Sequence, residues 1–282
     1  MTAVHDKQAE FALPRPSRRP SRRAVQTSVR RIVSLAILVL LIVAWQVTSD
    51  HFIRPIWISS PRLVWHDFVV TAKDGSLARN TWATAEEALL GLVIGTAGGI
   101  VAGIVLAKAT TIAKVLDPYV LGAYSLPRIA LAPFFVLWFG IGLESKVALV
   151  VSIVFFMVLF NVKQGMQSID PDLVDAMRSM RAKPFAALWY VTIPSLLPWI
   201  VASIKICIGM ALIGAVVGEL VGANKGLGWE MSNGLNNFDT TTAFTALIAM
   251  LVLAMALYYA MAFIEGRLFR WRDTSQTGST PM

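Results

Sequence analysis

The sequence predicts an all-α polytopic membrane protein with six transmembrane helices. Of the 282 residues, 56% are hydrophobic and only 15% are charged, whereas soluble domains carry about 25% charged residues. Six apolar segments approach the roughly 20 residues that a membrane-spanning helix needs. The net charge of +8 is concentrated in the first 31 residues, so no folded region is expected to have the basic face that nucleic-acid binding requires.

Each predicted span is bounded by charged or turn-forming residues. The six spans are 32–48, 88–107, 118–143, 147–162, 195–219 and 243–264. The first and fourth are short, but Arg31, Lys146 and Lys163 at their ends can extend their charged groups to the membrane interface and so complete the span.

The composition outside the spans predicts three regions and an orientation. Residues 1–31 are rich in Arg, Pro and Ser and are expected to form a disordered basic arm, residues 32–272 the six-helix transmembrane domain, and residues 273–282 a disordered tail. Seventeen of the 25 Lys and Arg residues lie on the side that holds both termini. Because basic residues favour the cytoplasmic side, we expect both termini and the loop 163–194 to be cytoplasmic.

Few residues offer catalytic or metal-binding chemistry. Cys207 is the single cysteine and the three histidines are scattered, so neither an intramolecular disulfide nor a metal site is expected. The sequence has no Gly-Lys pair, and hence no G-x-x-x-x-G-K-[ST] phosphate loop with which to bind ATP. We therefore predict no catalytic residue, no metal and no cofactor in this chain, and an enzyme is disfavoured.

Two rows of glycine recur every four residues, and each row shares one helical face. They are Gly91, Gly95, Gly99 and Gly103 in the second span and Gly214, Gly218 and Gly222 in the fifth. Such rows let the backbones of two membrane helices approach closely. We predict that both are packing faces, against a helix of the same chain or of a second copy.

The third span is interrupted by Pro127 and Pro133, each of which removes a backbone donor and disfavours helix in the residue before it. We expect a kinked or broken helix, which a membrane tolerates only where protein or water covers the backbone. Arg128 has two interpretations: it lines a solute path and attracts an anionic solute, or it binds carbonyl groups that the break frees. Glu219 is a weaker path candidate, since it can equally lie at the outer interface.

The cytoplasmic loop is predicted to contain two short helices. Asp170 followed by Pro171 is typical of a helix N-terminus, and apolar residues then recur at helical spacing. This pattern stops near Arg181, and Pro184 begins a second helical stretch that Pro194 ends. Such an exposed pair either docks into a groove on a partner protein or lies on the lipid headgroups.

This loop resembles the cytoplasmic EAA signature of the membrane subunits of ABC importers, which reads E-A-A, three residues, Gly, nine residues and I-x-L-P. The spacing is kept, with Asp175, Ala176 and Met177 at the start, Arg181 at the glycine position, and Val191, Thr192, Ile193 and Pro194 at the end. The resemblance implies that these residues couple the chain to an ATPase. If Arg181 adopts the left-handed conformation of a helix C-terminus, it should cost about 1 kcal/mol relative to glycine.

Two further patterns are similar to the branch of these permeases that carries nitrate, sulfonates, taurine and related solutes. One is P-x-x-A-x-x-P…W-F-G-x-G, from Pro127 to Gly142, and the other is Gly218-Glu219-Leu220 followed by Gly226-Leu227-Gly228. The resemblance covers about residues 55–272. It implies a type I ABC importer permease of the bacterial inner (plasma) membrane, which translocates a small organic or inorganic solute.

The resemblance also implies partners. A separate ATP-binding cassette subunit would bind ATP and Mg²⁺ and dock on the loop 163–194, an extracytoplasmic solute-binding protein would deliver the solute, and a second copy of the chain would complete a homodimeric pore in the lipid bilayer. The alternative is a secondary, ion-coupled transporter. That class needs carboxylates near the middle of the membrane, and only Glu219, near the end of a span, is available.

Overall fold

The computed structural model describes residues 22–51 and 57–269, and in these residues the chain forms helices and their connections without a strand. The long helices are α1 (Arg22–His51), α3 (Ser76–Lys108), α6 (Leu143–Gln167), α9 (Ile193–Val221) and α11 (Thr240–Leu268). The shorter ones are α2 (Pro61–Lys73), α4 (Thr110–Ser125), α5 (Ala132–Phe139), α7 (Pro171–Ser179), α8 (Pro184–Ala187) and α10 (Leu227–Asn236). A 3₁₀ turn, η1 (Arg128–Leu131), precedes α5, and a π-helical turn, η2 (Leu188–Thr192), precedes α9.

The predicted spans are confirmed in type. Among the described residues, five helices are long and apolar enough to cross a membrane, and α4 with η1 and α5 is apolar enough as a pair that is bent by 79°, which gives six spans when the bent pair is counted as one. The bend confirms the break predicted from the prolines of the third span. The helices are longer than the apolar segments, because helical hydrogen bonding continues into the polar residues at their ends. Helix α3, for example, begins at Ser76 rather than near residue 88.

The N-terminal helix also starts earlier than expected. α1 begins at Arg22, within the segment 1–31 that the sequence assigns to a disordered arm. Residues 1–21 and the C-terminal tail 273–282 lie outside the described residues.

The core of the bundle is α6, which lies between α3 and α9. Its Val150, Val154, Val158 and Val162 are fully buried, and they recur every four residues along one face. Val150 contacts both neighbouring helices, since it faces Gly91 of α3 and also packs against α9. Buried apolar side chains of α3, α6 and α9 form one continuous cluster.

The glycine row of α3 packs against α6 of the same chain. A methyl group added at Gly91 would lie 2.4 Å from Cβ of Val150, and one added at Gly99 would lie 2.7 Å from the carbonyl oxygen of Phe155. Contacts this short leave no room for a side chain larger than hydrogen, so these glycines set the distance between the two helices.

The glycine row of α9 packs against the same region of the fold. Gly214 faces Val150, Gly218 faces the side chain of Lys146, and Gly222 faces Val136 of α5. Both rows are therefore packing faces, as predicted. The sequence alone did not show which helix each row packs against. In both cases the neighbour belongs to this chain.

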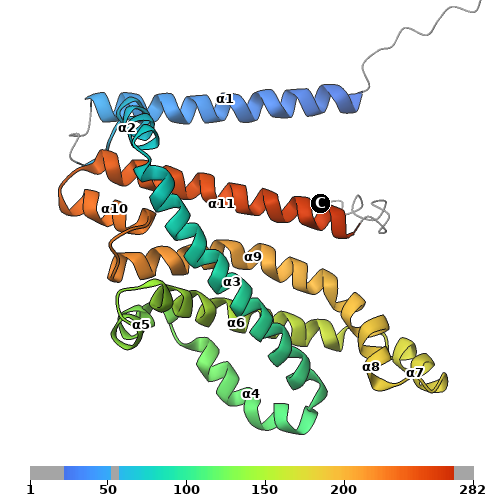
Figure 1. Ribbon diagram of the computed structural model, residues 1–282. Coiled ribbons are helices and arrows are strands. Elements are labelled where there is room, and N and C mark those ends of the chain that lie inside the picture. The colour runs from blue at the N-terminus through green and yellow to red at the C-terminus, as the bar shows by residue number, and fades with distance from the viewer. Residues whose placement is uncertain (1–21, 52–56, 270–282) are drawn as a thin grey trace, which may run out of the picture.

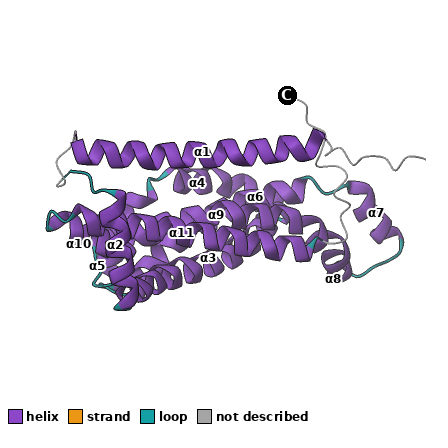
Figure 2. Ribbon diagram, turned by 90° about the horizontal axis from the view of Figure 1, so that it is seen from above, coloured by secondary structure: helices purple, strands orange, loops and turns teal. Residues whose placement is uncertain are grey.

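Helix α1 lies apart from the bundle. Only 6% of its membrane-spanning window is buried, against 39–44% for α3, α6 and α9, and it lies beside the other helices as a separate rod (Figures 1 and 2). It is attached near its C-terminal end, where Trp45 Nε1 donates to the carbonyl of Ser59 at 2.8 Å and the Trp45 ring contacts Phe244. α1 thus contributes little to the core that positions the rest.

Apart from α4, the short helices gather at two opposite ends of the bundle. α2, α5 and α10 lie at one end and α7 with α8 at the other (Figures 1 and 2). We call these the α10 end and the α7 end. Because α3, α6, α9 and α11 connect the two, a movement at one end can reach the other through continuous helices.

Candidate functional site

The α7 end begins with a helix whose start is fixed by Asp170. Its Oδ1 accepts a hydrogen bond from the backbone amide of Asp172 at 3.0 Å, and its carbonyl accepts one from the amide of Leu173 at 3.2 Å. A carboxylate at this place caps amides that have no partner within the helix and interacts favourably with the helix dipole. The N-terminus predicted at Asp170-Pro171 is confirmed.

The turn after α7 places Arg181 in the left-handed region, with φ of +52°. The amide of Ala182 donates to the carbonyl of Met177 at 3.1 Å, which is the six-to-one bond of a Schellman helix end. The backbone therefore has the shape that glycine favours, although arginine stands at this position. Arg181 carries the expected cost of about 1 kcal/mol relative to glycine.

The α7 end presents apolar side chains to its surroundings. Met180, Phe185 and Tyr190 are each more than two-thirds exposed, and Leu173 is half exposed. Asp175 and Ala176 are also exposed, whereas Met177 is half-buried. An apolar surface on short helices that project from a bundle is suited to a groove on a partner protein.

The second helical stretch of this loop continues into α9. The prediction that Pro194 ends it is wrong, because α8 passes through the π-helical turn η2 into α9 without a break. Pro194 therefore lies inside a continuous helix, where its missing amide removes one helical hydrogen bond directly after the π-helical turn η2. Thr192 is buried and its hydroxyl donates to the carbonyl of Ala187 at 3.3 Å. Val191 and Ile193, half-buried beside Thr192, thus belong to the joint between α8 and α9.

The break in the third span is stabilised by Arg128. Pro127 has no amide to donate to the carbonyl of Ala123, four residues earlier, and Nη2 of Arg128 donates to that carbonyl instead, at 2.9 Å. Nη1 donates to the carbonyl of Ser152 in α6, and the guanidinium lies 4.0 Å from the ring centroid of Phe156. Arg128 therefore binds a carbonyl freed by the break, as the second interpretation expects. Pro133 lies in the first turn of α5, just past the bend.

At the α10 end, Glu219 lies under the N-terminus of α10. Glu219 is 1% exposed; its Oε1 accepts from the hydroxyl of Thr84 at 2.6 Å and its Oε2 from the amide of Gly228. The same Thr84 hydroxyl accepts from the amide of Leu227 at 2.8 Å. The first amides of a helix lack partners within it, and here side chains of α3 and α9 supply them.

Asn80 of α3 completes this cap. Its Oδ1 accepts from the amide of Gly226 at 3.1 Å, and its Nδ2 donates to Oε2 of Glu230 in α10 at 2.6 Å. Burial raises the pKa of the Glu230 carboxyl above its ordinary value, and the hydrogen bond from Asn80 opposes that rise. Three consecutive amides, at the N-cap and the first two residues of α10, thus donate to three buried side chains, which fix α10 against α3 and α9.

A buried ion pair lies beside this cap. Nζ of Lys146 is 3.2 Å from Oε1 of Glu87, and the two side chains are 3% and 1% exposed. The sequence predicted that Lys146 extends its charge to the interface, and this prediction is wrong because Glu87, just outside the predicted second span, faces it from α3. Lys163, in contrast, binds Asp117 at 2.5 Å in a partly exposed pair.

The structure does not bring Arg128 and Glu219 together. Arg128 contacts α6 at Ser152, whereas Gly218, next to Glu219, packs on Lys146 of the same helix. Lys146 and Ser152 are six residues apart in α6, which corresponds to roughly 9 Å along the helix axis. The residues that sequence reasoning missed are Asn80, Thr84 and Glu87; their only signal was polar character at the edge of a span, which does not tell buried from exposed.

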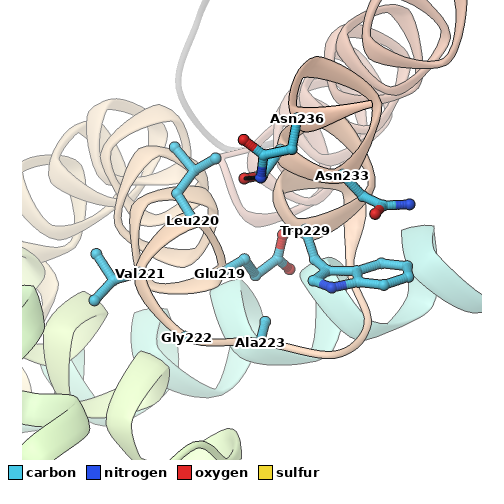
Figure 3. Close-up of a pocket in the computed structure, with 9 residues that line it drawn as sticks. Glu219, Leu220, Val221, Gly222, Ala223, Trp229, Asn233 and Asn236 are labelled. Carbon is cyan, nitrogen blue, oxygen red and sulfur yellow. Dashed lines mark hydrogen bonds between the residues drawn. The ribbon is translucent and has the colours of Figure 1, made fainter. Parts of the chain in front are cut away.

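A polar cavity of about 200 Å³ opens beside Glu219 (Figure 3). It is lined by the C-terminal turn of α9, the residues after it and one face of α10: Glu219, Leu220, Val221, Gly222, Ala223, Trp229, Ser232, Asn233 and Asn236. Glu219 is the one charged residue of this lining. Within the described residues, no group of three or more His, Cys, Asp or Glu side chains could hold a metal ion.

Comparison with known sequences identifies relatives over most of the chain. Residues 99–270 match the family described as "Binding-protein-dependent transport system inner membrane component". A probable ABC transporter permease of Haemophilus influenzae is 30% identical, covering 86% of this chain and 98% of that protein. A formylaminopyrimidine transport permease of Halalkalibacterium halodurans is 29% identical (83% and 93% covered), and the taurine transport permease of Escherichia coli is 27% identical (84% and 88% covered).

Comparison with solved structures identifies the fold. An inward-facing methionine ABC transporter contains a chain that superposes with a TM-score of 0.61 at 22% identity, covering 71% of this chain and 97% of that chain. The similarity shows the type I importer fold predicted from the sequence.

Proposed function

Because the chain belongs to the family of inner-membrane components of binding-protein-dependent transport systems, and is therefore the permease of an ABC importer, we propose that its α7 end receives a separate ATPase subunit. The observation that supports this most directly is the exposed apolar surface of α7 and α8. This surface belongs to the loop whose residues keep the spacing of the EAA signature. ATP and Mg²⁺ would be bound by that partner, since this sequence has no phosphate loop.

We propose that the α7 end is cytoplasmic and the α10 end faces outward. The loop 163–194 carries four basic residues and lies on the side that holds seventeen of the 25 Lys and Arg residues, and such residues favour the cytoplasm. Both termini are cytoplasmic in this orientation. A solute-binding protein would then deliver its cargo at the α10 end.

We propose that a second copy of the chain completes the pore. The bent third span leaves large apolar side chains uncovered, among them Leu137, Trp138 and Ile141, each about two-thirds exposed or more. The span is bent, and non-helical backbone at membrane depth needs protein or water beside it. A second copy facing this span would supply that cover and enclose a path between the two subunits.

The coupling mechanism follows from the continuity of α8 with α9. When the ATPases close on ATP, α7 and α8 would move with them, and the joint at Val191, Ile193 and Pro194 would pass the movement into α9. The close contacts of α9 with α6 at Gly214 and Gly218 would make these helices move as a unit. Such rigid-body motion is the usual means by which a packed bundle switches between two states.

The coupling contact is expected to fail when charge is introduced at its centre. Replacing Ala176 and Met177 by glutamate should reduce co-purification of the ATPase and ATP-driven uptake by about tenfold or more, because two carboxylates would be buried in an apolar interface without partners. Co-purification from membranes and uptake into proteoliposomes measure the two effects.

The matched control is Lys114→Glu, which also adds negative charge at an exposed position of the protein but in α4, outside the loop. It should leave co-purification unchanged. If the variant at Ala176 and Met177 binds the ATPase and imports solute as the wild type does, then Asp175, Ala176, Met177 and Arg181 are not the coupling contact.

We propose that the bend of the third span, with Pro127, Arg128 and Pro133, borders the solute path, and that Glu219 supports its outer end. The partners that the structure gives the Arg128 guanidinium are backbone carbonyls and aromatic rings, none of which cancels its charge. Arg128 therefore retains positive potential that attracts the anionic end of a solute.

Removing that charge should slow uptake of an anionic solute. Arg128→Ala is expected to reduce it by about tenfold, since focused potentials change local solute concentration by that order or more. Arg128→Lys, which keeps the charge, should retain most of the uptake. Normal uptake of an anionic solute by Arg128→Ala would contradict the assignment.

A further inference from the structure

The cavity beside Glu219 has the chemistry of a cation site. Its lining contains one carboxylate and no basic side chain, and Lys225, in the same turn, is exposed and does not line it. Next to the cavity, the buried Lys146 pairs with Glu87, and no ion pair of Glu219 is found among the described residues, where its oxygens accept from Thr84 and Gly228. The carboxyl groups of this buried region thus outnumber its amines.

The backbone adds to this negative character. α9 ends at Val221, so the carbonyls of its last turn, at Glu219, Leu220 and Val221, have no helical amide to accept from. These residues line the cavity. A helix C-terminus is equivalent to roughly half a negative charge. The opposite partial charge at the N-terminus of α10 is met by Asn80, Thr84 and Glu219, which accept from its amides, so the carbonyls of α9 remain as acceptors for a positively charged group.

The side chains of α10 complete the site. Trp229 presents an indole ring to the cavity (Figure 3), and tryptophan is the aromatic side chain that binds cations best. Ser232, Asn233 and Asn236 add oxygen acceptors beside it. The oxygen of Asn233 also accepts from Asn237 at 3.1 Å, which holds the Asn233 amide in place.

We propose that this cavity binds the ammonium group of a small organic amine, as an outer subsite of the solute path. The volume of about 200 Å³ lies below the range of drug-sized ligand sites, so a few heavy atoms fill it. This inference rests on the proposed function for the direction of transport. A solute that carries both an amine and an anionic group could contact this cavity first and Arg128 at a later point of the path, whereas a simple anion would interact with Arg128 alone.

The test uses the purified full-length chain in lipid nanodiscs, with ethylammonium and ethanesulfonate as probes of equal size and opposite charge. Ligand-detected NMR should show saturable binding of ethylammonium and none of ethanesulfonate. Trp229→Leu should weaken ethylammonium binding about fivefold or more. Trp82→Leu, an exposed tryptophan of α3 outside the cavity, is the matched control and should bind as the wild type does.

A second variant keeps the test decisive if Trp229→Leu does not fold. Asn236 is exposed and should tolerate Asn236→Lys, which is expected to abolish ethylammonium binding and to admit ethanesulfonate. The inference is wrong if ethylammonium does not bind the wild type, if ethanesulfonate binds equally well, or if Asn236→Lys leaves both unchanged. Co-purification of the ATPase is scored separately, so failure here with an intact complex overturns the amine site and leaves the permease proposal standing.

Discussion

Lys146→Met should lower the free energy of unfolding by about 3–5 kcal/mol, the cost of leaving one partner of a buried ion pair without the other. Glu87 is 1% exposed, and its Oε2 already has no hydrogen-bond partner among the described residues. Without Lys146, the remaining carboxylate oxygen would also lose its cation. Unfolding of the purified chain in a detergent series, followed by circular dichroism, measures the change.

Two controls separate this effect from general damage. The double variant Lys146→Met with Glu87→Gln should recover most of the lost stability, because no uncompensated charge remains. Lys163→Met, in the same helix, should cost no more than about 1 kcal/mol, since its partner Asp117 is 46% exposed and such pairs contribute little. A double variant no more stable than Lys146→Met would show that the ion pair is not the cause.

Gly99→Ala should separate α3 from α6 and destabilise the bundle by about 1–3 kcal/mol, the usual cost of overpacking. The added methyl group would lie 2.7 Å from the carbonyl oxygen of Phe155 and 3.1 Å from the amide nitrogen of Leu159. Both are backbone atoms, so no side-chain rotation relieves the contact. The same unfolding series measures the loss.

The matched control is Gly209→Ala in α9. Nothing lies within 4 Å of a methyl group at that position, and alanine favours helix over glycine. This variant should be as stable as the wild type or slightly more stable. If Gly99→Ala and Gly209→Ala behave alike, the glycine row of α3 does not set the distance between α3 and α6.

The local features of this chain were predictable because their causes lie close together in the sequence. Pro127 lacks an amide whatever surrounds it, so the bend of the third span follows from one residue. Asp170 caps the amide of Asp172, two residues later, and the left-handed turn at Arg181 ends a helix that begins ten residues before. The loop at the α7 end was therefore anticipated in outline, except for the continuous joint at Pro194.

Long-range pairs were not predictable in the same way. Lys146 and Glu87 are each near the end of an apolar segment, where hydropathy expects charges to reach the interface. Glu219 was expected either to border the path or to lie at the outer interface, but it caps α10 with Thr84, a residue 135 positions away in the sequence. Which polar residue faces another depends on the rotation of each helix about its axis. The hydropathy of a segment does not determine that rotation.

Hydropathy, proline position and motif spacing therefore decide the number of spans, the break and the family of this chain, because each depends on residues within a few turns of one helix. The packing of α3, α6 and α9 decides the rest: which helix the glycine rows meet, that Lys146 is buried, and that Glu219 lies between a helix cap and a cavity. Those outcomes require backbones brought into contact from distant parts of the chain, and only the folded bundle defines such contacts.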